Sequence, residues 1–153
     1  MSVAQRGPRR RERTASQARA AARRVTLQAL YRWQLNRCEW QELVQEFTPE
    51  AEALHADAQY LQRLVHGIVE QHAELDAALA PLLDRKPAEL DPIEHAALLI
   101  GSFELQQQPD VPFRVAVSEA VGLSRRFGAS EGHKLVNAVL DRGARLWRAA
   151  EVG

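Results

Sequence analysis

The sequence predicts an all-α fold, a single compact domain built as a bundle of about seven helices. Three observations lead to this prediction. The chain has 153 residues, and about 150 residues is a typical size for one domain. Hydrophobic residues make up 46% of the chain, which is enough to form a core without metal ions or disulfide bonds. Every strong apolar segment repeats at intervals of three or four residues, as in a helix, and none alternates as in a strand.

The first half of the chain contains four predicted helices. The first is expected to begin at Ser16, where the serine caps it. The second ends at Thr48-Pro49, because a residue before proline disfavours the helical conformation. The third begins at Asp57, and the fourth is interrupted at Pro81. The apolar residues that define these helices are Ala18, Ala22, Val25, Ala29 and Trp33, then Trp40, Leu43, Val44 and Phe47, then Tyr60, Leu61, Leu64, Val65, Ile68 and Val69, then Leu75, Leu79, Leu82 and Leu83.

The second half predicts three more helices. Asp91-Pro92-Ile93-Glu94 has the pattern of a helix start, with Asp91 as the cap, Pro92 in the first position and Glu94 closing a capping box. This fifth helix runs to about Gln107. The sixth is expected to end at Gly128 in a left-handed conformation. Ser130 is expected to cap the seventh, whose apolar face consists of Leu135, Val136, Val139, Leu140, Gly143, Leu146 and Trp147.

The formal charges cancel, at 20 basic and 20 acidic residues, but they are segregated along the chain. Residues 1–24 contain eight arginines and one acid, whereas residues 39–94 contain thirteen acids and three basic residues. Residues 1–15 are predicted to be a disordered Arg-rich tail, because they have too few apolar side chains to fold. The folded domain is expected to span residues 16–150. A basic arm of this kind indicates an anionic partner.

No motif for catalysis, a cofactor or a metal ion is present in the sequence. The five histidines have no metal-ligand spacing, and Cys38 is the only cysteine. We therefore expect a protein that is not an enzyme and has no catalytic residues, no metal site and no cofactor. A single cysteine fits a reducing compartment, the apolar stretches are too short to span a membrane, and no secretory signal is present. The expected location is the cytoplasm, without membrane contact.

The basic arm and the fifth helix suggest two binding surfaces. Arginines beside a helix N-terminus attract phosphates, so the arm is expected to bind RNA or DNA with a strong salt dependence; a purely solubilising tail is the alternative. Glu94, His95 and Leu98 are expected to point away from the apolar line of the fifth helix. A mixed charged and apolar face of this kind can dock a protein, although an ordinary surface has the same composition.

Several motifs, in order, resemble those of the NusB transcription antitermination factor family. They are Gln28-Ala-Leu-Tyr-Arg-Trp-Gln-Leu35, then Pro92-Ile-Glu94 with Gly101-Ser-Phe-Glu-Leu105, then Pro109-Asp-Val-Pro-Phe-Arg-Val-Ala-Val-Ser-Glu-Ala-Val121, and finally Arg126-Phe-Gly128 with His133-Lys-Leu-Val-Asn-Ala-Val-Leu-Asp141. The resemblance covers roughly residues 18–148. It implies an all-helical, non-catalytic factor that binds single-stranded boxA-type leader RNA of ribosomal RNA operons. The implied protein partners are the ribosomal protein NusE and the RNA polymerase antitermination complex.

The resemblance also implies site residues. The RNA surface would comprise the start of the first helix and the start of the last, with Arg19, Arg23, Arg24, Gln28, Tyr31, Glu131, Lys134 and Leu135. The partner surface would include Glu94, His95 and Leu98. The sequence departs from the family pattern where the family often has arginines, at Ala20–Ala22 and Leu99. It also departs where the family often has a phenylalanine, at Leu135, and a tyrosine, at Phe103.

Two other classes of function are considered. One is a protein-interaction module, a homodimer whose basic face is masked until a partner binds. The other is part of an RNA methyltransferase, because NusB-like domains also precede such enzymes; the chain ends at Gly153 without room for a methyl-donor fold.

Overall fold

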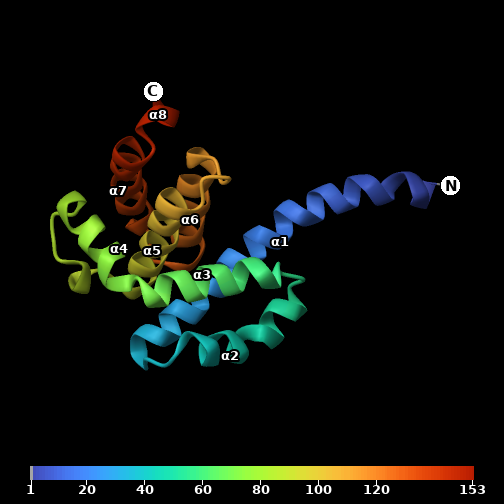
Figure 1. The fold of residues 1–153 in the computed structure, drawn as a ribbon, viewed down its shortest axis with the longest axis horizontal. Helices are drawn as coiled ribbons and strands as arrows, with labels where there is room; N and C mark the ends of the chain where they lie inside the picture. Colours follow the sequence, from blue (N-terminus) through green and yellow to red (C-terminus); the bar gives the residue numbers. More distant parts are fainter. Residues whose placement is uncertain (1) are drawn as a thin grey trace.

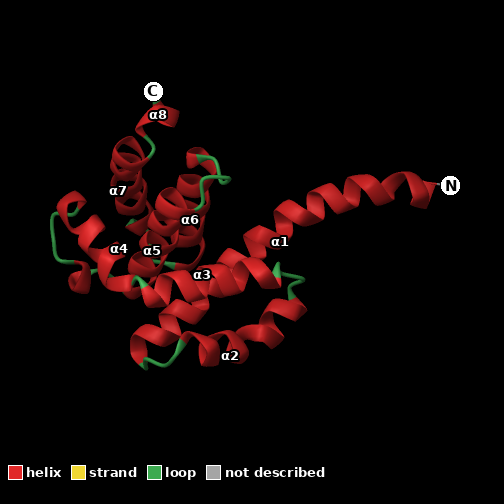
Figure 2. Cartoon of the chain, in the orientation of Figure 1, coloured by secondary structure: helices red, strands yellow, loops and turns green. Residues whose placement is uncertain are grey.

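The computed structural model describes the backbone of residues 2–153 and the side chains of residues 15–153. In this part of the chain all regular structure is helical, which confirms the predicted all-α class (Figure 2). The two 3-10 turns, Ala80–Leu82 and Pro87–Glu89, lie between α4 and α5. The helices are α1 (Ser2–Leu35), α2 (Trp40–Ala53), α3 (Ala58–Glu70), α4 (His72–Leu79), α5 (Pro92–Gln107), α6 (Phe113–Phe127), α7 (Gly132–Trp147) and α8 (Ala149–Val152).

The first turns of α1 extend away from the other helices (Figure 1). Because α1 begins at Ser2, Ser16 lies inside the helix, and its predicted role as the N-cap is wrong. Arginine and alanine are good helix formers, and they dominate the segment between Pro8 and Ser16. The predicted disordered tail covers residues 1–15, and Met1 and the side chains of residues 2–14 lie outside the described residues. From Ala18 onwards α1 packs into the bundle.

Helix α5 is the centre of the fold. It contacts α1, α3, α4, α6 and α7, and every residue from Ala96 to Leu105 is buried. A helix that is apolar around its whole circumference is expected to be buried on all sides. One layer is formed by α1, α2 and α3, and a second by α5, α6 and α7 (Figure 1). Gly101 allows α7 to come close, because a Cβ at this position would overlap the Leu140 side chain.

At four helix ends, a predicted boundary, cap or backbone conformation differs from the structure. Helix α2 continues through Pro49 to Ala53, because Ala51 is buried in the core and its packing offsets the missing hydrogen bond. Gly128 has an extended conformation, with φ −99° and ψ −172°, rather than a left-handed one. Ser130 does not cap α7, which has Glu131 at its N-cap position. Asp91 makes no side-chain cap bond to α5, so the predicted capping box is wrong, although Pro92 does occupy the first turn.

Candidate nucleic-acid interface

One exposed face of α1 carries three of the predicted RNA-binding residues. Arg24, Gln28 and Tyr31 follow one another at intervals of four and three residues, which places them along one side of a helix. Arg24 and Gln28 are half-buried, and Tyr31 is 40% exposed. The opposite side of α1 packs against α2, α3 and α5. The structure therefore brings these three residues, hereafter the α1 row, onto the solvent side of the helix.

Arg24 also faces α6. Together with Ser118, Gly122 and Arg126 it lines a small groove of about 130 Å³ between the two helices. Arg126 is not among the binding residues predicted from sequence, although it forms a basic pair with Arg125 in the last turn of α6. This pair of adjacent arginines is the sequence feature that could have indicated a binding residue on α6. Arg126 adds an exposed guanidinium beside the half-buried Arg24 of the α1 row.

Arg19 is partly accessible but already has partners. Its guanidinium pairs with Asp110 at 3.2 Å and lies 4.2 Å from the centre of the Tyr60 ring. About a third of the side chain is exposed, at 34%. An exposed ion pair of this kind contributes little to stability, so Arg19 can exchange Asp110 for another anion at small cost.

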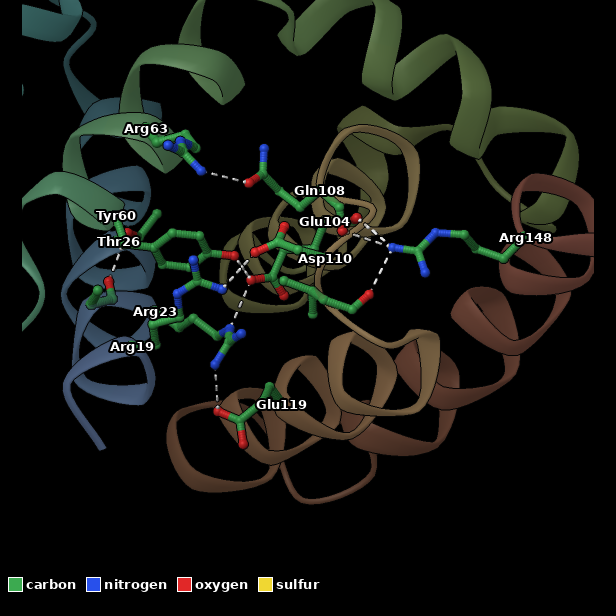
Figure 3. A network of polar contacts seen from close by, with 12 residues as sticks. Arg19, Arg23, Thr26, Tyr60, Arg63, Glu104, Gln108, Asp110, Glu119 and Arg148 are labelled. Carbon is green, nitrogen blue, oxygen red and sulfur yellow. Dashed lines mark hydrogen bonds and ion pairs between the residues drawn. The ribbon is translucent and has the colours of Figure 1, made fainter. Parts of the chain in front are cut away.

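Arg23 does not lie on the surface, and its predicted contact with RNA does not fit this position. The residue is 4% exposed, and its Nε donates to Glu104 Oε2 at 2.8 Å (Figure 3). A second, longer contact of 3.4 Å joins Arg23 to Glu119 on α6. A guanidinium cannot be buried without a counter-charge, and Glu104 on the central helix supplies it. Arg23 thus holds α1 against α5 and α6.

The buried pair includes a third group, the Tyr60 hydroxyl, which donates to the same oxygen of Glu104 (Figure 3). Burial raises the pKa of Tyr60, and the charge of Glu104 raises it further, so the phenol stays protonated and remains a donor. Burial is the largest single effect and lowers the pKa of Arg23, but the charge of Glu104, the hydrogen bond to it and the charge of Glu119 together contribute to a net upward shift. Arg23 therefore stays ionised. The other oxygen, Glu104 Oε1, has no hydrogen-bond partner among the described residues.

The second edge of the predicted surface lies at the start of α7. Glu131 and Lys134 are exposed and pair with each other at 2.6 Å. Leu135 is half-buried and packs against the core. The α7 helix begins here with Gly132, which is buried.

The start of α5 connects this edge with α1. The Gln34 amide donates to the Pro92 carbonyl at 3.1 Å, which ties the last turn of α1 to the first turn of α5. Two residues further on, Glu94 packs so closely on Gly132 that a Cβ at Gly132 would collide with its carboxylate. The two edges predicted from sequence are therefore joined by direct contacts through the start of α5.

The predicted partner-binding residues are not on a common exposed face. Leu98 is completely buried, at 0% exposed, and Glu94 is 8% exposed. His95 is half-buried, and its Nε2 lies 2.7 Å from Asp76 Oδ1 on α4. The prediction that these three residues point away from the core is wrong, because α5 is the central helix and neighbours cover all its sides.

Burial raises the pKa of Glu94, and the nearby charge of Asp91 adds to this effect, whereas Arg85 opposes it. Because the folded-state pKa lies above the unfolded-state value, Glu94 contributes stability at low pH that is lost as the pH rises through the raised pKa. We therefore expect Glu94→Gln to raise the Tm at pH 8 by about 2 °C, but not at pH 4. Thermal melts at pH 4, 6 and 8 check this. Equal shifts at all three pH values would contradict it.

The described residues contain no group of three or more histidine, cysteine, aspartate or glutamate side chains that could hold a metal ion. Cys38 is half-buried and is not part of a disulfide. Among the helices of this part of the chain, none has the length and apolar character needed to cross a membrane. What the surface offers instead is arginine, amide and aromatic side chains on neighbouring helices.

The family model, the sequence relatives and a solved structure all indicate the same family. The NusB family model matches residues 20–145. The transcription antitermination protein NusB of Xanthomonas axonopodis pv. citri (strain 306) is 44% identical over 135 residues, which cover 88% of this chain and 85% of that protein. NusB of Stenotrophomonas maltophilia (strain K279a) is 41% identical over 146 residues, 95% and 92% of the two chains.

The fold agrees with the sequence relatives. A solved structure of T. maritima NusB superposes with a TM-score of 0.73 at 26% identity, and the match covers 83% of this chain and 90% of that one. The family consists of transcription antitermination factors, which are regulatory and not catalytic, and this supports the prediction that the chain is not an enzyme. The family model covers most of the chain, and the relatives exceed 40% identity along nearly their whole length. The chain belongs to the NusB family.

Proposed function

We propose that this protein is a non-catalytic transcription antitermination factor that binds single-stranded boxA-type leader RNA of ribosomal RNA operons. It acts in the cytoplasm together with NusE, a ribosomal protein, and the RNA polymerase antitermination complex. The observation that carries the proposal is the α1 row beside Arg126, in which the half-buried Arg24 and Gln28 and the exposed Tyr31 lie on the solvent side of α1. The names of the relatives, all transcription antitermination proteins, support the same role.

Each exposed group has a distinct task in this proposal. Arg24, Arg126 and Arg19 neutralise phosphates, and this gives affinity but no sequence preference. The Tyr31 ring, 40% exposed, stacks on an unpaired base. The Gln28 amide donates and accepts at a base edge. At the other edge Lys134 can leave Glu131 for a phosphate, and Leu135 offers an apolar contact.

Arg23 has a different task from the one expected from sequence. Its guanidinium is occupied by Glu104 and Glu119, so it acts as a positioning residue that fixes α1 relative to α6. The α1 row and Arg126 lie on those two helices. The arginines also do not act at a helix N-terminus, because α1 begins at Ser2. Their own charges, rather than free backbone N–H groups, attract the phosphates.

Binding to a labelled single-stranded boxA-type RNA, measured by fluorescence anisotropy between 50 and 300 mM salt, tests the proposal. We expect the affinity to fall steeply with salt. For Arg19→Ala with Arg24→Ala, the slope of log affinity against log salt should decrease by about 2, because two phosphates are no longer neutralised. Tyr31→Ala should weaken binding by about 5- to 150-fold, equivalent to about 1–3 kcal/mol, without changing the slope.

Arg142→Ala is the matched control. Arg142 is an exposed arginine on α7 that donates to the Leu82 carbonyl at 2.9 Å and lies outside the α1 row. It should bind RNA like the parent protein. Equal losses in Arg142→Ala and in the α1 variants, or affinity independent of salt, would contradict an RNA surface on α1.

The alternative is a homodimer that masks the basic face until a partner arrives. Tyr31 and Leu35 are exposed at 40% and 70%, and they continue the row as an apolar end that a second copy could cover. Sedimentation with and without RNA separates the two proposals. A dimer that dissociates as RNA is added supports masking, whereas a dimer that persists at saturating RNA contradicts it.

A further inference from the structure

A second, larger groove adjoins the one beside Arg24, since Ser118, Glu119 and Gly122 of α6 line both. None of the residues assigned to RNA binding lines this second groove. It lies between α6, α7 and the last residues of α8, and its volume is about 800 Å³. One wall is the outer face of α6 from Arg114 to Arg125, and on α7 Asn137, Asp141 and Arg145 form the other. Its apolar lining consists of Phe113, Val117, Val121 and Val152.

Some charged side chains along this groove have ion-pair partners, and others have none among the described residues. Its two carboxylates already have partners, since Asp141 pairs with Arg145 at 3.1 Å and Glu119 pairs with the buried Arg23 at 3.4 Å. Arg114 and Arg125, at opposite ends of α6, pair with no carboxylate among the described side chains. The groove therefore presents positive charge without a carboxylate partner at both ends, with polar and apolar side chains between them.

Gly122 lies in the middle of the groove wall. A Cβ at this position would meet no other atom within 4 Å, so the fold does not require glycine there. Glycine is the least favourable residue, apart from proline, in the interior of a helix. An open glycine that lines a groove is the arrangement expected where another backbone approaches the helix closely.

The far end of the groove is held in place by the C-terminal helix. The Glu151 carboxylate accepts from the Phe113 N–H at 2.9 Å and also pairs with Arg148. The Phe113 N–H and the Arg148 guanidinium lower the pKa of Glu151, which therefore stays ionised. Val152 is thereby kept against the start of α6, and the groove has a fixed end.

We propose that this groove binds an acidic amphipathic helix of a partner protein. Two roughly antiparallel helices form its walls, and a third helix fits such a groove through apolar residues spaced at i, i+3, i+4 and i+7. The distance along α6 from Arg114 to Arg125 is about 16 Å, or about three helical turns. Acidic residues at both ends of the bound helix would face Arg114 and Arg125.

A phosphate polymer fits this groove less well than an acidic peptide. Val117 and Val121 place apolar side chains between the two arginines, and the carboxylates of Asp141 and Glu119 also line the groove, where they repel a continuous run of phosphates. A peptide can place its few carboxylates at the two ends and its leucines between them. Charge and apolar pattern together therefore favour the peptide.

The probe is a labelled alanine-based peptide of about 14 residues with central leucines at i, i+3, i+4 and i+7 and glutamates at both ends. Anisotropy titrations with the full-length protein should show saturable binding. The same peptide with lysines in place of the glutamates should not bind. We expect Gly122→Leu to weaken binding by at least about tenfold, because the side chain fills the groove, while Tm and helicity are unchanged or rise.

Ala138→Leu is the matched control, because Ala138 is an exposed α7 residue outside the groove; it should bind the peptide normally. Arg114→Ala with Arg125→Ala should weaken binding by about fivefold at low salt. Equal binding of the two peptides, binding unaffected by Gly122→Leu, or the absence of binding at millimolar protein would each overturn the proposal. Competition by single-stranded RNA would also overturn the proposal, because RNA would then be the occupant of the groove. Self-association of the protein that Gly122→Leu abolishes would overturn it as well, because a second copy would then be the occupant.

Discussion

Glu104→Gln is expected to lower the free energy of unfolding by about 3–5 kcal/mol, the usual loss when one partner of a buried ion pair is removed. Glu104 is 0% exposed and receives the Arg23 guanidinium at 2.8 Å, together with the Tyr60 hydroxyl. The amide leaves Arg23 buried with only the longer contact to Glu119. Urea denaturation followed by circular dichroism measures the change.

The matching double variant separates the pair from its surroundings. Arg23→Met with Glu104→Met replaces both charges by apolar side chains of similar length, and buried pairs replaced in this way often lose little stability. We expect the double variant to be at least about 2 kcal/mol more stable than Glu104→Gln. If Glu104→Gln costs less than about 1 kcal/mol, the buried pair does not hold α1 in the way the structure indicates.

The same double variant tests the task assigned to Arg23. If Arg23 only positions α1, a folded double variant should bind boxA-type RNA with the salt slope of the parent protein. If Arg23 itself contacts a phosphate, the slope should fall by about 1 even though the fold is intact. Stability and salt slope therefore separate a positioning residue from a binding residue.

Arg23 illustrates why the sequence could not assign the whole site. Arg19, Arg23 and Arg24 have the same local context, an arginine-rich and alanine-rich helix, and local patterns do not distinguish them. The partner that buries Arg23 is 81 residues away in the chain. Arg24 remained on the surface because its side of α1 faces only a shallow groove. Helical periodicity places a residue on a face of its helix, but the tertiary packing decides which faces are covered.

Helix α5 shows the same limit for the partner surface. Its existence and its start at Pro92 followed from sequence. Glu94, His95 and Leu98 were expected on an exposed side, yet Glu94 and Leu98 are buried. The uninterrupted apolar run around Leu99 was the stronger signal, since a helix that is apolar on all sides belongs in the centre of the fold. A charged residue in such a helix predicts a buried partner rather than a surface.

Arg148→Met is expected to lower the free energy of unfolding by about 3 kcal/mol, because its guanidinium closes the end of the central helix. It donates to four carbonyl oxygens, at 2.7 Å to Leu105, 3.1 Å to Glu104, 2.9 Å to Gln108 and 2.8 Å to Val111 (Figure 3 shows this cluster). The last carbonyls of a helix have no partner within it. Here one planar side chain, with a 10% exposed surface, satisfies those of α5 and of the following loop.

The geometry of this cap predicts that lysine cannot replace Arg148. Lysine keeps the charge, but it lacks the planar fork of five N–H donors that reaches several carbonyls at once. Arg148→Lys should therefore recover less than half of the stability that Arg148→Met loses. Arg145→Met is the control, because its exposed pair with Asp141 should contribute less than about 0.5 kcal/mol. Hydrogen exchange should locate the loss of protection in the segment 105–112. Full rescue by lysine would show that the charge of Arg148 matters and its cap of α5 does not. A loss of protection spread evenly over α5, α6 and α7 would also contradict a local cap.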